Sequence, residues 1–440
     1  MSVSSIGLSG IRAAEAQLQT AAANIANANV QGYSLETVQL VPDGDGAGVR
    51  VSGIQRASAP FLSREINADS ASAAFNAALF QVTNSAQAIL SPSGGGDISG
   101  LLQNLFNMFE SLSASPEDTV IRQQVVSAAQ QFADASVIVT NSLRGVAETS
   151  AAGLSELVGE ANSALRQVAD LNRQIAAVRS SGGNFGPLED QRDQLIATIA
   201  ALTGAEGDVQ GDVSLGGIPL VSGTDSYSLV LTGSSSTISI DLPGGPIQLP
   251  SEAIGGTIGG TLAGVEQVLS LAQKINILID STSAAINSVH ASGFGLDGSS
   301  GNALFTIPAT PGPIAINSAI GPDQIAASSR GMPGDGSNAG SIARLSSQQG
   351  IAPAFGLSTA SQAWGQIVAA FGEVVKGAND SSRQSQAAAQ ALENFRSSIT
   401  GVSINEQLAL ILQYENELQA SGRVVAAASD MISFLIQTLQ

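Results

Sequence analysis

The chain of 440 residues contains no cysteine and a single histidine. The absence of cysteine excludes disulfides and thiolate metal sites, and one histidine removes most histidine-based metal and catalytic arrangements. Aromatic residues make up 4% of the chain and charged residues 12%. Core volume must therefore come from alanine, leucine, isoleucine and valine, which suits closely packed helices better than a large catalytic cavity.

Basic residues are also scarce, because 17 Lys and Arg stand against 36 Asp and Glu, for a formal net charge of -19. Nucleic acid is not an expected partner, since its binding needs a basic footprint. No uninterrupted apolar run reaches the roughly 18 residues of a membrane-spanning helix, so no membrane span is expected. The N-terminal segment lacks the basic region and the apolar run of a Sec-type signal peptide.

Apolar residues recur every seven positions at both ends of the chain. This spacing is typical of helices that pack along their length, and neither terminal helix can bury its stripe alone. The two ends are therefore expected to pack on each other or on the ends of neighbouring subunits, which indicates a building block of an assembly. Ala14, Ala21 and Ala28 occupy the second core position of the first helix. The stripe residues are Ile11, Leu18, Ile25, Ile404, Ile411, Leu418, Val425, Ile432 and Leu439.

Between the two ends, the hydrophobic pattern changes several times. A helix is expected from about Ser4 to Asn27, and alternating residues around a Pro-Asp-Gly turn predict a β-hairpin over 33–56. Helical periodicity dominates 60–205, with a break at 92–96. Short alternating runs among Gly, Ser and Thr predict a small β domain over 206–254, after which helix returns.

These patterns predict a mainly α fold with a β insert (α+β). Its body is a long antiparallel helical bundle or coiled coil made from both chain ends, with a β-hairpin and an inserted small β domain. Three domains are expected. They are a terminal coiled-coil assembly domain (1–32 and 401–440), a helical body with the hairpin (33–205 and 255–400), and an outward-facing β insert (206–254).

Catalytic and ligand-binding motifs are weak in this sequence. His290, the single histidine, is interpreted as a polar residue near a helix end. Gly293–Gly298 formally matches GxGxxG but follows a helix instead of opening one, which favours a loop. Asp43–Gly46 contains the first two acids of a calcium loop but no glutamate at the twelfth position, which favours a hairpin turn. No catalytic residue, metal site or cofactor is expected.

Two polar groups remain candidates for a contact surface. Asp190–Asp193 lies at a helix start, where a surface contact and local ion pairing are equally acceptable interpretations. Asn24, Asn27 and Asn29 precede Gly32-Tyr33, and they fit either ordinary helix-ending residues or an assembly interface that fixes where the terminal helix stops. The interface interpretation is preferred, because a buried Asn specifies register in helical seams.

These asparagines also carry a family resemblance. Asn24–Asn27, followed by Asn29 and Gly32–Ser34, resembles the N-terminal signature of the flagellar axial proteins. Val30-Gln31 departs from the Thr-Pro that is commoner before Gly-Tyr. Further stretches resemble the hook-associated members of this family in the same order along the chain. They are Gly48–Arg56, Leu188–Leu195, Gly334–Ala339, Val402–Gln407 and Tyr414–Ala428.

The resemblance implies a structural subunit of the bacterial flagellum that joins hook to filament and has no enzymatic activity. It implies self-association in a ring, contacts with the hook protein and a second junction protein, and an export chaperone on the C-terminal helix. The expected location is extracellular, at the hook–filament junction, after type III export without a cleaved Sec signal. The chain is short for this family, which implies a reduced outer domain.

Two alternatives differ from this expectation. One is another flagellar axial subunit of the hook, rod or flagellin type, which would share the N-terminal signature but lack the Leu188–Leu195 and Gly334–Ala339 stretches. The other is a secreted carbohydrate-binding or hydrolytic protein built around the β insert. That class needs clustered aromatics and paired carboxylates between 206 and 340, where Tyr227 is the only tyrosine or tryptophan.

Overall fold

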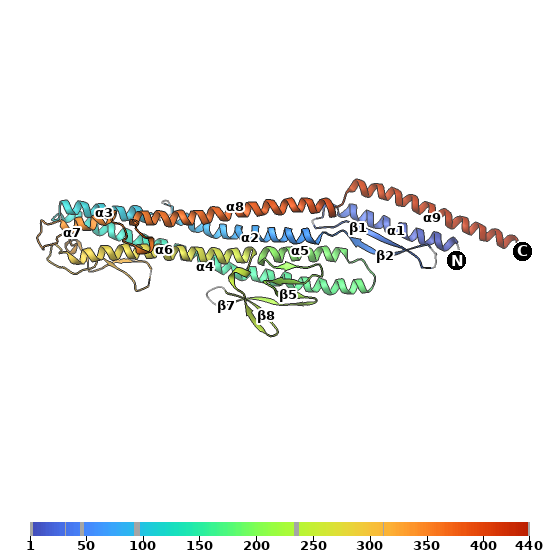
Figure 1. The fold of residues 1–440 in the computed structure, drawn as a ribbon, viewed down its shortest axis with the longest axis horizontal. Helices are drawn as coiled ribbons and strands as arrows, with labels where there is room; N and C mark the ends of the chain where they lie inside the picture. The colour runs from blue at the N-terminus through green and yellow to red at the C-terminus, as the bar shows by residue number, and fades with distance from the viewer. Residues whose placement is uncertain are drawn as a thin grey trace. The chain divides into compact units, whose positions relative to one another are not determined.

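The computed structural model describes residues 3–30, 32–44, 48–91, 97–232, 237–310 and 312–438. Long helices dominate the chain and the sheets are small and antiparallel, so the expected mainly α fold with β parts is confirmed (Figure 1). The chain forms two compact units. Unit 1 consists of Met1–Ala74, Glu156–Gly259 and Arg383–Gln440, and unit 2 of Phe75–Ser155 and Gly260–Ser382.

The helices follow the predicted periodicity closely. A short break after Thr400 separates the last two helices, and the longest helix runs for 62 residues through Gly145 and Gly153. Their bounds are α1 Val3–Asn27, α2 Pro60–Ile89, α3 Ile98–Ala114, α4 Thr119–Ser180, α5 Gly186–Thr203, α6 Gly256–Ser292, α7 Ser337–Arg344, α8 Ala360–Thr400 and α9 Ile404–Thr438.

Unit 2 has an apolar core, built mainly from residues of α2, α3, α4, α6, α7 and α8. Phe132 and Phe305 meet edge to face in it, with ring centroids 5.9 Å apart. Among the helices of the described residues, α6 alone is long and apolar enough to cross a membrane, as judged from length and composition only. Its apolar residues, such as Ile275 and Ile286, are buried in this core. Burial within the protein accounts for part of the apolar composition of α6, since 44% of its most apolar 18-residue window is buried.

Arg122 is a buried cation of unit 2 that binds backbone carbonyls. Its guanidinium donates to the oxygens of Pro116 at 2.7 Å and Ile325 at 2.7 Å, and to Pro322 at 3.2 Å. A buried charge is tolerated only when hydrogen bonds replace its water shell, and these carbonyls do so. The arginine thereby fixes the turn at Pro322–Gln324 against the start of α4.

His290 is fully buried in unit 2, which the sequence did not indicate. Its Nδ1 lies 2.7 Å from the carbonyl oxygen of Asn302, and its Nε2 lies 3.1 Å from the backbone nitrogen of Ala326. Because the Ala326 N–H must donate, Nε2 accepts and Nδ1 carries the ring proton. Burial lowers the pKa of His290 below its ordinary value. The ring is therefore neutral and joins two loops.

Acidification is expected to destabilise unit 2 through His290. The pKa is depressed only in the folded state, so the unfolded chain takes up the proton first as the pH falls below about 6.5. Neutral His290 makes its full contribution to the stability of unit 2 above that pH, and this contribution is lost as the pH falls toward the folded-state pKa. Urea midpoints between pH 7 and 4 measure this, with His290→Gln as the non-titrating control. Identical pH slopes for both proteins would contradict the assignment.

In unit 1, α1 and α9 run antiparallel and side by side (Figure 1). Gly7 lies against Val425, whereas Asn24, at the other end of α1, contacts Gln407. A Cβ atom added to Gly7 would lie 2.7 Å from Val425 Cγ2. The buried positions of α1 are occupied by small or polar residues, and these allow the close approach. They are Gly7, Ala13, Ala14, Thr20, Ala21 and Asn24.

The predicted hairpin is confirmed as β1 (Glu36–Pro42) and β2 (Val49–Arg56), which pair antiparallel from Glu36↔Arg56 to Pro42↔Val49 with one irregularity after Gln39. The Val49 N–H donates to Ser9 Oγ at 3.2 Å, which ties the hairpin to α1. Of the Asp43–Gly46 turn, the last two residues lie outside the described residues.

The predicted β insert is present as two small sheets in unit 1. One has the strand order β3-β4-β5-β6 and the other the order β7-β8-β9. A further two-stranded sheet, β10-β11, lies in unit 2. The bounds are β3 Glu206–Gly207, β4 Val213–Leu215, β5 Ile218–Ser222, β6 Asp225–Ser226, β7 Ser228–Thr232, β8 Thr237–Leu242, β9 Gly245–Gln248, β10 Phe305–Thr306 and β11 Ala315–Ile316.

Side chains of α4 and α5 fasten the insert by its backbone. The amide of Asn162 exchanges two hydrogen bonds of 2.8 Å with the backbone of Leu229. Arg192, which is buried, donates to the carbonyls of Val209 and Gln210, both at 3.0 Å. Since buried polar groups need such partners, the insert and the two helices depend on each other.

Candidate assembly surface and its polar joint

The structure brings most of the predicted stripe onto the α1–α9 pair. Ile404 and Ile432 are exposed, at 43% and 48% of their surface, and Leu439 lies outside the described residues. The large stripe residues are thus only partly covered within the chain. The helix pair instead buries Ala14 and Ala21, at the second core position. The half-buried members are Ile11, Leu18, Ile25, Ile411, Leu418 and Val425.

More apolar side chains are exposed on this pair than the seven-residue pattern identified. Leu412 is 63% exposed and Phe434 66%. Exposed apolar residues that gather on one element mark an interaction surface. Sequence reasoning missed them because they fall outside the seven-residue spacing. The others on the pair are Val3, Ile6, Leu8, Leu408, Val424, Met431, Leu435 and Ile436, and Val30 is exposed just beyond the end of α1.

Asn24 lies at the inner end of the pair and is 1% exposed. Its Oδ1 accepts from the Glu36 N–H at 3.0 Å and from the Tyr33 hydroxyl at 2.8 Å. Its Nδ2 donates to the Glu36 carbonyl at 2.9 Å and to Gln407 Oε1 at 3.0 Å. One amide thus joins α1, the start of the hairpin and α9. We call this cluster of four residues the Asn24 joint.

The other two predicted asparagines lie outside this joint. The Asn27 amide donates to the Ala23 carbonyl of its own helix at 3.0 Å, and Asn29 is exposed just after the helix ends. Nothing in the spacing distinguishes Asn24 from its neighbours. The useful signal is its position three residues after Ala21, almost one helical turn, which places both on the same face of the helix.

The joint continues through the buried side chain of Glu36. Both oxygens of its carboxylate accept from the amide of Asn184, at 3.1 and 3.0 Å. The side-chain oxygen of Asn184, Oδ1, in turn accepts from the N–H of Gly186, the first residue of α5. Burial raises the pKa of Glu36, and the Asn184 hydrogen bond opposes the rise. Hydrogen bonds therefore run from α9 to α5 across five segments.

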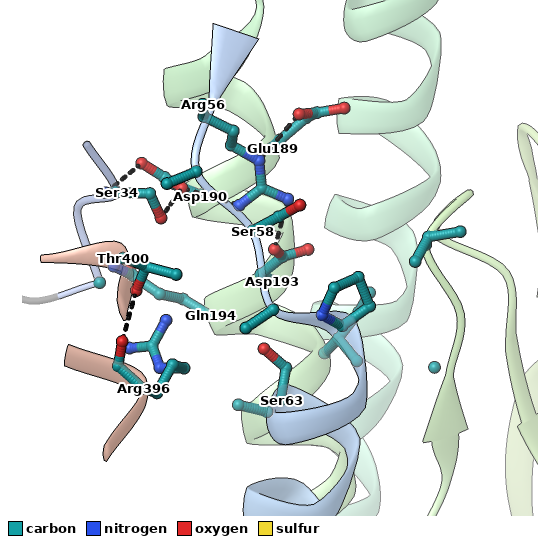
Figure 2. A pocket seen from close by; sticks show the side chains of 18 of the residues that line it. Ser34, Arg56, Ser58, Ser63, Glu189, Asp190, Asp193, Gln194, Arg396 and Thr400 are labelled. Carbon is teal, nitrogen blue, oxygen red and sulfur yellow. Dashed lines mark hydrogen bonds and ion pairs between the residues drawn. The ribbon is translucent and has the colours of Figure 1, made fainter. Parts of the chain in front are cut away.

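Arg56, the last residue of β2, lies among three carboxylates of α5 (Figure 2). Its Nε contacts Glu189 at 2.8 Å, and its two terminal nitrogens contact Asp190 at 2.9 Å and Asp193 at 2.6 Å. Burial disfavours the charged guanidinium, but Asp193 and Glu189 outweigh it and raise the pKa of Arg56. Such charge-assisted bonds from a planar fork are strong and directional.

Asp190 also receives hydrogen bonds from Ser34, which lies two residues before β1. The Ser34 N–H donates at 3.0 Å and the Ser34 hydroxyl at 2.9 Å. Burial raises the pKa of Asp190, and the bonds from Ser34 and Arg56 oppose this rise. Of the two interpretations of Asp190–Asp193, ion pairing is therefore observed, but with a distant arginine and inside unit 1.

An open cleft of about 630 Å³ lies beside these groups in unit 1. Ser58 and Ser63, Gln194 of α5 and Arg396 of α8 border it (Figure 2). Arg396 pairs with Glu393 of its own helix at 2.7 Å. Among the residues that the structure describes, no group of three or more His, Asp or Glu is placed to hold a metal ion.

The fold defines a class of protein before any comparison is made. Its two chain ends form one helix pair with exposed apolar side chains, and a polar joint fixes that pair to a hairpin and a helical body. Such an arrangement is typical of a structural subunit and not of a catalytic domain.

Residues 83–305 match a family model described as flagellar hook-associated protein FlgK helical domain. This match covers half of the chain, and the chain belongs to the FlgK family of flagellar hook-associated proteins. Flagellar hook-associated protein 1 of Salmonella typhimurium is 29% identical over 324 residues, which cover 68% of this chain and 58% of the relative. The Bacillus subtilis protein of the same name is 25% identical over 304 residues, 66% of this chain and 56% of the relative.

The chain thus spans less than two thirds of the length of these relatives. A solved structure shows the same fold over a larger share. The flagellar hook junction protein FlgK from Burkholderia pseudomallei superposes with a TM-score of 0.67 and 17% identity, over 78% of this chain and all of the other.

Proposed function

We propose that this protein is a structural subunit of the bacterial flagellum that joins hook to filament and catalyses no reaction. The observation that carries the proposal is the exposed apolar surface of the α1–α9 pair in a member of this family. Each Å² of apolar surface buried against a neighbour contributes about 25 cal/mol. Association through this pair depends on complementary surfaces and on the burial of apolar area, and it involves no covalent reaction.

The partners in this proposal are further copies of the chain in a ring, the hook protein and a second junction protein. An export chaperone covers the end of α9 before assembly, where Met431, Phe434 and Leu435 are exposed. The protein acts outside the cell after type III export without a cleaved Sec signal. Residues 1–32 and 401–440 assemble, 33–205 and 255–400 form the body, and 206–254 face outward.

The test is a strain that lacks this protein. Electron microscopy is expected to show hooks without filaments, with filament protein shed into the medium, and the gene for the full chain restores filaments. A complementing copy with Leu418→Asp is exported but fails to restore them, because a charge in a packed seam has no partner. Normal filaments on cells without the protein would refute the proposal.

Removal of the insert is expected to spare filament attachment only when Arg192, which loses hydrogen-bond partners, is replaced at the same time. Replacing 208–250 by a Gly-Ser linker takes away the two carbonyl partners of Arg192 and leaves its guanidinium with Asn172 Oδ1, at 3.2 Å, as hydrogen-bond partner. The same deletion with Arg192→Met is expected to be the more stable of the two, because methionine leaves no donor without its partner. Denaturant midpoints and swimming assays of both variants measure this. A deletion that is equally stable with either residue would contradict it.

A further inference from the structure

The buried face of α1 repeats small residues, because Gly7, Ala14 and Ala21 are spaced by seven residues. A slip of α9 by one heptad would again place small residues of α1 opposite it. It would bring Val425 opposite Ala14 in place of Gly7, so the close contact at Gly7 favours the native register. A buried polar residue adds to this selection, because it specifies register in such seams. Asn24 is the buried polar residue of α1 that contacts α9.

The amide of Asn24 uses all of its hydrogen-bonding capacity. Two acceptor and two donor positions are available on such a side chain, and all four are used. Three of these bonds go to Tyr33 and Glu36, at the start of the hairpin. They fix which way the amide faces, because the carbonyl oxygen is held by Tyr33 and the Glu36 N–H. The remaining N–H then has one direction left, toward Gln407.

We propose that Asn24 is a positioning residue that makes the docking of α9 depend on the hairpin. In this arrangement, the hairpin orients the amide, and the oriented amide accepts α9 only in the register that brings Gln407 opposite it. Any other register leaves a buried donor without a partner, which is costly. The backbone bond from the Leu35 N–H to the Thr400 carbonyl, at 2.8 Å, places the start of α9 beside the same site.

The absence of cysteine makes this register measurable in the full-length monomer. A Cβ atom on Gly10 would lie 3.3 Å from the Cβ of Ser421, close to the separation found in disulfides. Gly10→Cys with Ser421→Cys therefore reports the native register. Gly10→Cys with Ala428→Cys reports a slip of one heptad. Under mild oxidation the first pair is expected to cross-link and the second to remain largely reduced.

Asn24→Ala is expected to reduce cross-linking of the native pair roughly tenfold and to raise that of the slipped pair, since a lost buried hydrogen bond has about this effect on an equilibrium. Tyr33→Phe separates positioning from simple contact, because the Tyr33 hydroxyl bonds to Asn24 and lies outside α9. It is expected to shift cross-linking in the same direction, and to add nothing in an Asn24→Ala background. Asn416→Ala is the matched control, because this exposed amide donates only within α9, to the Leu412 carbonyl at 2.8 Å.

Two results would overturn the proposal. One is a slipped pair that cross-links as readily as the native pair in the unmodified background. The other is a Tyr33→Phe variant that behaves like Asn416→Ala. Circular dichroism of each variant verifies that the other helices remain folded. The proposal does not depend on the role at the hook–filament junction, since the cross-linking uses purified monomer and that role is tested in cells.

Discussion

Replacing Arg56 with methionine is expected to reduce the stability of unit 1 by about 3–5 kcal/mol. The arginine is the shared partner of Glu189, Asp190 and Asp193, and the first two are almost buried, with 14% and 8% of their side chains exposed. Without Arg56, like charges gather on one face of α5 with no compensating fork. Asp193 contributes less, since 40% of its side chain is exposed to solvent.

Denaturant unfolding measures this effect, with Arg50→Met as the control. Arg50 lies on the same strand and is exposed, so its removal is expected to change stability by less than about 0.5 kcal/mol. Arg56→Lys should recover only part of the loss, because an ammonium cannot present a planar fork to three carboxylates. Equal stability of Arg56→Met and Arg50→Met would mean that water solvates the three carboxylates and that their ion pairs with Arg56 do not stabilise unit 1.

Replacing Gly7 with leucine is expected to abolish filament attachment. Any side chain at this position meets Val425 Cγ2 at 2.7 Å and the Ser421 carbonyl at 3.1 Å, so α9 must move away from α1. Leucine has a higher helix propensity than glycine by about 1 kcal/mol, so α1 by itself gains stability. Any loss of function therefore comes from the separation of the two helices.

Gly159→Leu is the matched substitution. Gly159 also lies within a helix of unit 1, and nothing lies within 4 Å of a Cβ added there. This variant gains the same propensity without a collision, and cells that carry it are expected to swim normally. Motility assays and filament counts on cells with each variant decide. Normal filaments with Gly7→Leu would show that the close approach of α1 and α9 is dispensable.

Local patterns in the sequence determined the helices, the hairpin and the mainly α fold class. These features depend on periodicity and on turn residues within a few positions of each other, which a single chain displays directly. The same patterns predicted that the two ends would pack on each other or on the ends of neighbouring subunits. They placed both the large residues Ile11 and Leu18 and the alanines Ala14 and Ala21 at core positions. Within the chain, the structure buries the alanines and leaves the large residues half-buried.

Only the tertiary structure decided which polar residues meet. Arg56 and its carboxylates are 133 to 137 positions apart, and Asn24 and Gln407 are 383 apart. Such pairs depend on the orientation and register of whole elements, which no local spacing encodes. The burial of His290 has the same origin, because the loops that cover its ring come from outside its helix. The sequence by itself thus determined that both ends form helices with an apolar stripe, and long-range packing decided that they pair with each other and through which atoms they do so.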